Sequence, residues 1–370
     1  MGIVKRLSLI YTSSILDRPE EAGSMFGAGL SLGLMSLTIS DVAKAAGVST
    51  ATVSNVLNKR AKVGSSTRAL VLSTVRRLGY VPNPHARRLA SNDTRTLGII
   101  VSNVDNPFFS EVIKGFLART RELGYETILS ETNYQPGRVQ EAARRMMAHN
   151  VSGVAIMTCE ISARLVKELA ERKIAVSFLD HAPARGYVST LRIDYEGGID
   201  QIVQHLWDRG HRRIAFITGR PDLKSSVLRL EAYLKAMRAR SLNPAPVLPG
   251  DLGFDRGVAA GLELAKHSPR PTAIMAVNDL TAVGVLKGLQ TAGIRVPDDV
   301  SVTGFGCTRL SEYCQPSLTT IDVHREVLGQ MAADVVHELR KSSDPVGKVH
   351  EIAAKLVIGN STGPVSSVSS

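Results

Sequence analysis

The stretch ISDVAKAAGVSTATVSNVLN, residues 39–58, predicts two short helices joined by a tight turn. Apolar residues of the first helix recur at the spacing of one helix face, at Val42, Ala43 and Ala46. Gly47 supplies the turn, and Ser49 is of a residue type that caps helix N-termini, so we expect it to begin the second helix. Such a helix-turn-helix presents a short helix that fits the major groove of DNA.

The second helix of this motif has an apolar and a polar side. Val53, Val56 and Leu57 fall on one side and are expected to pack inward. The other side carries small and polar residues, namely Thr50, Ala51, Ser54, Asn55 and Asn58. Asparagine can pair with adenine through two hydrogen bonds, and alanine or the threonine methyl group can contact thymine. A helical hairpin without a role in DNA binding is the alternative that this stretch alone leaves open.

The charge of the flanking region favours DNA. Between Thr38 and Thr94 nine basic residues stand against two acidic ones, so this segment carries nine minus two, or +7, of the chain's net charge of +11. The basic residues are Lys44, Lys59, Arg60, Lys62, Arg68, Arg76, Arg77, Arg87 and Arg88. A concentration of positive charge in one small segment is typical of polyanion binding.

The composition of the whole chain indicates a soluble protein of two or three compact units. It has 370 residues, of which 44% are hydrophobic, and no apolar run is long enough to span a bilayer. The chain has 3 cysteines, Cys159, Cys307 and Cys314, without CxxC spacing, so we expect neither a disulfide framework nor a metal site, and no cofactor. The predicted location is the cytoplasm, on the nucleoid.

The first residues need a separate interpretation. Lys5 and Arg6 precede LSLIYTSSIL, which faintly resembles a signal peptide, but export would separate a DNA-binding segment from DNA. We interpret residues 1–36 as a non-native start or a disordered extension, and favour the former, with Met35 near the true initiator.

After the helix-turn-helix the pattern changes. Residues 66–78 predict a third helix whose inward stripe is Leu70, Val71, Thr74, Val75 and Leu78. From Thr96 onward apolar strands such as residues 97–101 alternate with amphipathic helices, and a second run of the same kind starts near Gly197. This alternation predicts parallel sheets covered by helices. The expected fold is therefore an all-α headpiece followed by an α/β core.

Three collinear segments together resemble the LacI/GalR family of bacterial transcriptional regulators: DVAKAAGVSTATVSNVLN, TRALVLSTVRRLGYVPNPHARRLAS and NPFFSEVIKGF. The resemblance runs from about Leu37 to Gly359. It implies a core of two lobes, similar to periplasmic binding proteins, with a ligand between them. The implied boundaries are a headpiece at 37–82, a hinge helix and linker at 83–95, an N-terminal lobe at 96–194 plus 324–342, a C-terminal lobe at 195–323 plus 343–363, and a disordered tail at 364–370.

The resemblance also implies which residues bind DNA. Thr50, Ala51 and Asn55 would face bases, and Ser49, Thr52, Ser54 and Asn58 would lie near phosphates. The family's hinge helix folds on DNA and drives a leucine into the minor groove; Leu89 occupies that position, with Arg87 beside it. Many members carry arginine where this chain has Asn55, so we expect a different base preference at that position.

The family's effector-binding positions map onto residues from both predicted lobes: Phe108, Phe109, His181, Asp194, Ser225, Arg229, Leu252, Asn278, Asp279 and Gly306. Phe108 could equally be a core residue. Sugar-binding members usually carry an acidic residue where Gly306 stands, and its loss removes a strong acceptor for a polyol. With Arg229 and His181 retained, the hypothesis is an effector that is anionic or less hydroxylated, such as a sugar acid, rather than a neutral hexose.

The function predicted from these features is an effector-controlled, sequence-specific transcriptional regulator, expected to act as a repressor. No leucine heptads follow residue 341, so we predict a homodimer on a near-palindromic operator rather than a tetramer. The alternative is a solute-binding protein for sugar transport, which the two-lobe core permits and the basic headpiece opposes. An enzyme is disfavoured because Walker, GxGxxG and HExxH motifs are absent from the sequence.

Overall fold

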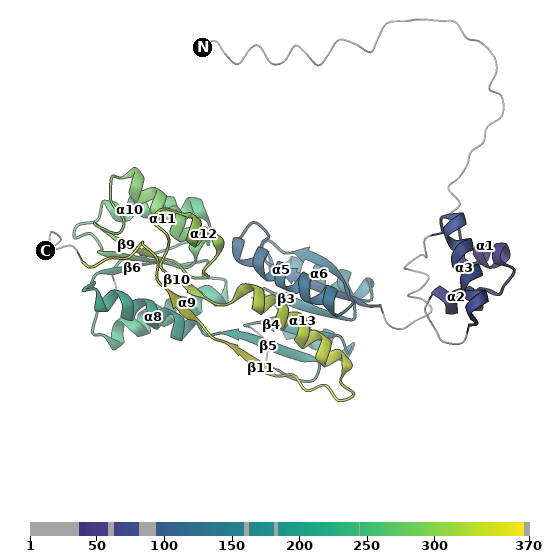
Figure 1. Ribbon diagram of the computed structural model, residues 1–370. Helices are drawn as coiled ribbons and strands as arrows, with labels where there is room; N and C mark the ends of the chain where they lie inside the picture. Colours follow the sequence, from purple (N-terminus) through teal and green to yellow (C-terminus); the bar gives the residue numbers. More distant parts are fainter. Residues whose placement is uncertain are drawn as a thin grey trace, which may run out of the picture. The chain divides into compact units, whose positions relative to one another are not determined.

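The computed structural model describes residues 37–57, 63–80, 94–158, 163–180, 184–243 and 245–365. The chain divides into two compact units, residues 1–90 and residues 91–370, which are the headpiece and the core (Figure 1). Each is considered by itself.

The headpiece contains three helices: α1 (Ile39–Ala46), α2 (Thr50–Leu57) and α3 (Ser65–Leu78). Helix α1 begins at Thr38, whose side chain and that of Asp41 cap each other's backbone N–H groups. It ends at Gly47, whose φ of 64° is left-handed and favours glycine. The Ser49 hydroxyl accepts a hydrogen bond from the Thr52 N–H at 3.1 Å, so Ser49 caps α2 as predicted.

The three helices enclose a small apolar core. Val42, Val53 and Val71, one from each helix, are 0% exposed, and Tyr80 closes the end of the core. The predicted stripe of α3 is correct except for Leu70, which is 49% exposed. Val71, Thr74, Val75 and Leu78 already complete an i, i+3, i+4, i+7 face, and Leu70 lies about 100° away from Val71 around the helix.

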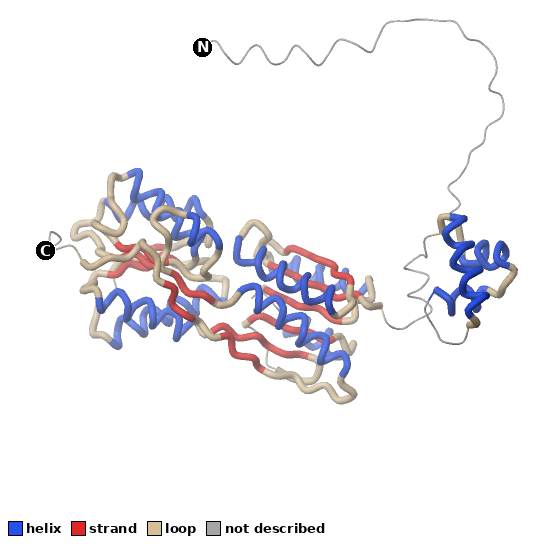
Figure 2. The backbone as a smooth tube through the Cα atoms, viewed as in Figure 1, coloured by secondary structure: helices blue, strands red, loops and turns tan. Residues whose placement is uncertain are grey.

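The N-terminal lobe of the core is built on a six-stranded parallel sheet in the order β11-β5-β4-β3-β1-β2. Its strands are β1 (Thr96–Val101), β2 (Glu126–Glu131), β3 (Gly153–Met157), β4 (Ala175–Leu179), β5 (Val188–Ile193) and β11 (Val349–Ile352). Helices lie on both faces, as Figure 2 shows. They are α5 (Pro107–Glu122), α6 (Pro136–Ala148), α7 (Ala163–Glu171) and α13 (Arg325–Lys341).

Strand β1 shows how sequence sets these layers. Its side chains alternate between faces: Leu97, Ile99 and Val101 pack with α5 and α13, while Ile100 packs with α6 and α7. All are 0% exposed, which is why the strand is a continuous apolar run rather than an alternating one.

The C-terminal lobe has a four-stranded parallel sheet in the order β7-β6-β8-β9. Its strands are β6 (Ile214–Ile217), β7 (Val247–Leu248), β8 (Ala273–Ala276) and β9 (Ser301–Thr303). Helices α8 (Tyr195–Asp208) and α9 (Lys224–Ala239) pack on one face. Helices α10 (Phe254–Ala265) and α11 (Asp279–Thr291) pack on the other, and α12 (Arg309–Tyr313) follows β9.

Helices α10 and α11 touch backbone to backbone through two pairs of glycines. A Cβ atom on Gly284 would lie 2.2 Å from the Phe254 carbonyl oxygen, and one on Gly257 would lie 2.3 Å from that of Thr281. The second pair, Gly261 and Gly288, is one turn further along each helix, with a Cβ on Gly288 2.3 Å from the Val258 carbonyl oxygen and one on Gly261 2.8 Å from that of Val285. Because a Cβ at any of these positions would collide with the partner backbone, only glycine fits.

The chain passes between the lobes at three places within the described core: from β5 into α8, from β10 (Thr320–Asp322) into α13, and from β11 into β12 (Lys355–Val357). Strands β10 and β12 pair antiparallel. The prediction that 343–363 belongs wholly to the C-terminal lobe is wrong, because β11 pairs with β5 of the N-terminal lobe. Residues 349–358 thus form two strands that belong to two different sheets.

Candidate functional site

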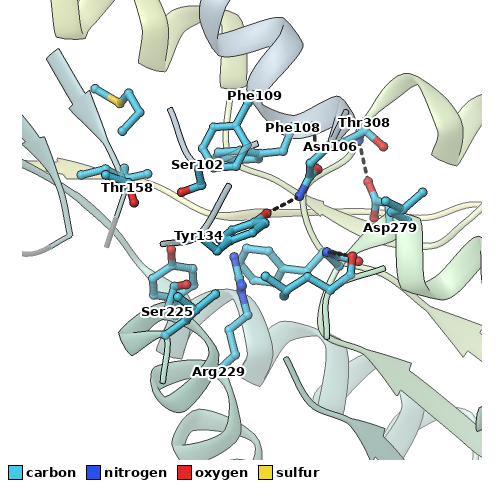
Figure 3. A pocket seen from close by; sticks show the side chains of 18 residues that line it. Ser102, Asn106, Phe108, Phe109, Tyr134, Thr158, Ser225, Arg229, Asp279 and Thr308 are labelled. Carbon is cyan, nitrogen blue, oxygen red and sulfur yellow. Dashed lines mark hydrogen bonds between the residues drawn. The ribbon is translucent and has the colours of Figure 1, made fainter. Parts of the chain in front are cut away.

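A cleft lies where the carboxyl ends of the two parallel sheets face each other. It is lined from the N-terminal lobe by residues that follow β1, β2, β3 and β4, and from the C-terminal lobe by residues of α9, of the segments before α10 and α11, and of the β9–α12 loop (Figure 3). The space, counted with its open mouth, is about 640 Å³. Clefts in this position are where small ligands bind in open α/β folds.

The N-terminal wall begins at the first turn of α5. Asn106 caps this helix by accepting a hydrogen bond from the Phe108 N–H at 3.1 Å, and Pro107 occupies the first helical position. The Asn106 amide donates to the Tyr134 hydroxyl at 3.2 Å, which ties this turn to the loop after β2. Phe108 and Phe109 meet edge to face with ring centroids 5.1 Å apart. The cap therefore fixes an aromatic corner of the cleft.

Among the described lining residues, the cation is Arg229 of α9, and its side chain points into the space between the lobes (Figure 3). Its guanidinium carbon lies 4.6 Å from the centroid of the Tyr195 ring and 4.7 Å from that of Phe305. Stacking between two rings holds the planar group in one orientation. Its Nε atom is buried and has no hydrogen-bond partner, and the same holds for the Thr158 hydroxyl across the cleft. Both atoms can bond a ligand.

Tyr195 is in turn held by a buried carboxyl group. The Tyr195 hydroxyl donates to one oxygen of Asp180 at 2.5 Å, and the Ile193 N–H donates to the other at 2.8 Å. Burial raises the pKa of the Asp180 carboxyl, while these two hydrogen bonds and the charge of Arg229 act in the opposite direction. Asp180 directly follows β4 in the N-terminal lobe and Tyr195 starts α8, so this bond spans the first crossing between the lobes.

The C-terminal wall contains Asn278 and Asp279 at the start of α11. Asn278 caps the helix by accepting from the Thr281 N–H at 2.8 Å, and its amide donates to the Leu252 carbonyl at 3.0 Å. The two oxygens of Asp279 accept from the Thr308 N–H at 2.6 Å and the Thr320 hydroxyl at 2.5 Å. Burial raises the pKa of Asp279. Both side chains therefore use most of their hydrogen-bonding atoms to hold the wall together, which leaves few atoms for a ligand.

Seven of the predicted effector residues line this cleft: Phe108, Phe109, Ser225, Arg229, Leu252, Asn278 and Asp279. His181 lies outside the described residues. The cleft also contains residues that the sequence reading missed: Ser102, Asn106, Tyr134, Met157, Thr158, Leu179, Tyr195, Leu223, Leu280, Phe305 and Thr308. Several directly follow buried strands, and that position is the signal that could have identified them.

Two predicted residues are not among those lining the cleft. Asp194 is exposed and accepts from the Gly197 N–H at 2.8 Å as the cap of α8, so its carboxylate is used for helix capping. Gly306 has no side chain to present, and its carbonyl oxygen accepts a hydrogen bond from the Arg325 guanidinium. A Cβ there would lie 3.9 Å from a ring carbon of Phe108, so this position borders the cleft without contributing to it.

In the headpiece, the described residues predicted to bind DNA gather on the α2 side away from its core. Ser49, Thr50 and Ala51 are exposed, and Thr52, Ser54 and Asn55 are half-buried. Asn58, Arg87 and Leu89 lie outside the described residues. Lys44, Arg76 and Arg77 are exposed on the neighbouring helices, so cations accompany the polar helix on the same small unit.

Two family models match the chain. Residues 38–83 match the bacterial regulatory proteins of the lacI family, and residues 203–362 match a periplasmic-binding-protein-like domain. The ribose operon repressor of Escherichia coli K12 is 35% identical over 303 residues, which are 81% of this chain and 92% of that protein. The chain belongs to the LacI family of bacterial transcriptional regulators.

Other LacI-family proteins show the same relationship. The repressor PurR of Photobacterium profundum is 33% identical over 88% of this chain and 98% of its own length. The catabolite control protein A of Priestia megaterium is 34% identical over 78% of this chain and 87% of its own length. This LacI-family protein is thus a DNA-binding transcription regulator, and the relatives named here are transcriptional regulators rather than enzymes.

Solved structures agree with the fold. The Lac repressor dimer bound to operator and the anti-inducer ONPF has a TM-score of 0.79 at 26% identity, covering 88% of this chain and 99% of that chain. The regulator CelR in complex with cellobiose has a TM-score of 0.63 at 29% identity over the same shares. The helix-turn-helix headpiece and the two-lobe core predicted from sequence are therefore confirmed. None of the helices in the described ranges is long and apolar enough to cross a membrane.

Proposed function

We propose that this LacI-family protein is a repressor that binds a near-palindromic operator as a homodimer and is controlled by a small anionic effector, such as a sugar acid, in the interlobe cleft. The DNA-binding part rests on the exposed polar side of α2 within a basic headpiece. Dimerisation is supported by the likeness to a Lac repressor dimer on operator. In a dimer, two α2 helices would read two half-sites.

The class of effector is inferred from which polar groups in the cleft have hydrogen-bond partners and which do not. Arg229 brings a guanidinium whose Nε atom is buried without a partner, and the Thr158 hydroxyl opposite is also buried without one. The carboxylate that lines the cleft, Asp279, already accepts two short hydrogen bonds. Among the described residues that line the cleft, Arg229 and Thr158 thus offer donors without a partner, whereas both oxygens of the carboxylate already accept a hydrogen bond. A carboxylate-bearing ligand satisfies such a site better than a neutral polyol does.

The body of the effector is expected to stack on aromatic rings. Phe108 and Phe109 form one aromatic corner, and Tyr195 and Phe305 flank Arg229. Ring faces bind the apolar faces of sugars and other flat groups. With Gly306 in place of an acidic residue, the hydroxyl side chains of the two walls, such as Ser102 and Ser225, can recognise ligand hydroxyls.

The test combines operator and effector. Purified protein is used to select from randomised DNA duplexes, and the selection is repeated with ribose, glucose and galactose and with the corresponding aldonic acids. We expect a palindrome whose recovery changes with an acid and not with the matched neutral sugar. Substitution of Arg229 by glutamine should abolish that effect while leaving the palindrome unchanged. If only neutral sugars act, the effector class is wrong; if no motif emerges, the operator-binding role is wrong.

A further inference from the structure

A partly buried ion pair of the N-terminal lobe contacts the C-terminal lobe just outside the cleft. Glu111 of α5 and Arg325, the first residue of α13, both belong to the N-terminal lobe, and their side chains are only 18% and 10% exposed. The Nε and Nη2 atoms of Arg325 lie 3.1 and 3.0 Å from the same Glu111 oxygen, Oε2. Binding both donors at one oxygen leaves Oε1 for another partner.

Both members of this pair also reach across to the C-terminal lobe. Glu111 Oε1 accepts a hydrogen bond from the backbone N–H of Arg309, 3.3 Å away. Arg325 donates to the carbonyl oxygen of Gly306 and lies 3.3 Å from Asp322 Oδ1. Gly306 and Arg309 belong to the β9–α12 segment of the C-terminal lobe, so the pair is one network that holds residues of both lobes.

The same two segments of chain form walls of the cleft. Phe108 precedes Glu111 by less than one helical turn, while Phe305 and Thr308 are the immediate neighbours of Gly306 and Arg309. A movement that separates the lobes at this edge would therefore break the two cross-lobe hydrogen bonds and widen the cleft together. The Arg325 side chain is only 10% exposed, and a charged hydrogen bond from such a donor resists separation more than an exposed one does.

We propose that Glu111 and Arg325 form a latch that sets how far the two lobes close, and so sets effector affinity without contacting the effector. The part about affinity rests on the proposed function, whereas the part about closure does not. A ligand that binds only closed lobes has an apparent affinity that is reduced in proportion to the open population. The latch thus stabilises the closed arrangement before the ligand arrives.

A matched control lies on the same two helices. Lys114 of α5 and Glu326 of α13 form an ion pair at 2.8 Å, one residue along from Arg325, but their side chains are 56% and 43% exposed and neither has a hydrogen bond across to the C-terminal lobe within the described residues. The E326Q variant removes a charge from the α5–α13 contact without touching the latch. The E111Q variant keeps the shape of Glu111 and removes the charge that orients Arg325.

The experiment uses the full chain without any effector or DNA. Hydrogen–deuterium exchange is measured on peptides that cover residues 305–309, and the radius of gyration is measured by solution scattering. For E111Q we expect exchange of this segment to rise about tenfold, which corresponds to about 1.4 kcal/mol, together with a larger radius of gyration. For E326Q we expect both to match the unsubstituted protein.

Two outcomes overturn the latch. If E111Q and E326Q change exchange at 305–309 equally, the pair has only a local role in the α5–α13 contact. If exchange rises across the whole core in E111Q, the substitution has unfolded the lobe, and R325K then decides, because lysine keeps the positive charge but loses the fork that reaches both Glu111 and Gly306. Unchanged exchange at 305–309 in a folded R325K variant refutes the latch. Neither readout depends on the effector or operator, so these failures are distinct from failure of the proposed function.

Discussion

Acidification should weaken the C-terminal lobe through His205 of α8. The Arg209 guanidinium, which can only donate, lies 3.1 Å from Nδ1 of His205, and the Thr362 hydroxyl lies 2.9 Å from Nε2. The geometry therefore requires a neutral ring with its proton on Nε2. Burial, reinforced by the charges of Arg209 and His211, lowers the pKa of His205 from its ordinary value of 6.5 to about 4.

The size of the effect follows from these two values. Between pH 6.5 and 4 the unfolded chain binds more protons at His205 than the folded chain does, so the free energy of unfolding decreases as the pH falls through this window. At pH 5 the unfolded imidazole is almost fully charged and the folded one almost fully neutral. The resulting loss is about 2 kcal/mol relative to pH 7.5.

The assay is urea unfolding at pH 7.5 and pH 5, followed by the fluorescence of Trp207, the chain's 1 tryptophan, which lies two residues from His205. The H205Q variant has no titrating group at this position, so its pH-dependent loss should be smaller by about 2 kcal/mol. The remainder includes His211, whose pKa burial also lowers. H149Q, at the exposed end of α6, is the control and should leave the loss unchanged. Equal losses in the unsubstituted protein and H205Q would show that His205 does not cause the pH-dependent loss of stability.

Three further substitutions test particular contacts. Ser49→Ala removes the cap on the Thr52 N–H and should destabilise α2 by about 1 kcal/mol. The measurement is amide exchange of that helix in the full chain. Unchanged exchange would mean that water replaces the cap. Gly284→Leu would place a side chain against the Phe254 carbonyl oxygen, which a Cβ meets at 2.2 Å. It should lower the free energy of unfolding of the C-terminal lobe by about 3 kcal/mol or more. A stable variant would show that α10 and α11 can separate at little cost in free energy. Tyr195→Phe leaves one oxygen of the buried Asp180 without its donor and should cost about 1–3 kcal/mol in core stability, whereas equal urea midpoints would show that the bond is not needed.

Local patterns in the sequence predicted most of the elements, because their causes are local. The caps at Thr38, Ser49 and Asn106 and the continuous apolar run of β1 follow from short-range chemistry and full burial. Strand pairing is not local. Residues 349–358 form an extended apolar segment in either lobe, and only the neighbouring strands decide that 349–352 joins β5 while 355–357 joins β10.

The candidate site was predictable to a similar degree. Residues carried over from the family, such as Arg229 and Asn278, line the cleft. Asp194 was also carried over from the family, but its carboxylate caps α8 instead of lining the cleft. A carboxylate one residue before a helix can either cap that helix or bind a ligand, and the sequence does not distinguish the two roles. Tyr134 was missed because it lies in a loop after β2, and its role depends on the Asn106 amide, 28 residues away.

The glycine contacts between α10 and α11 have a consequence for changing what this regulator responds to. Leu252 lies just before α10 and Asn278 caps α11, so two residues of the cleft are attached to the ends of helices whose closest contacts are made by the glycine backbone. That wall should behave as a single rigid unit. Substitutions in it should lower folding stability more than they change which ligand binds. Efforts to redirect the regulator to a new metabolite should therefore vary the first turn of α5 and the exposed end of α9, and leave the wall formed by α10 and α11 unchanged.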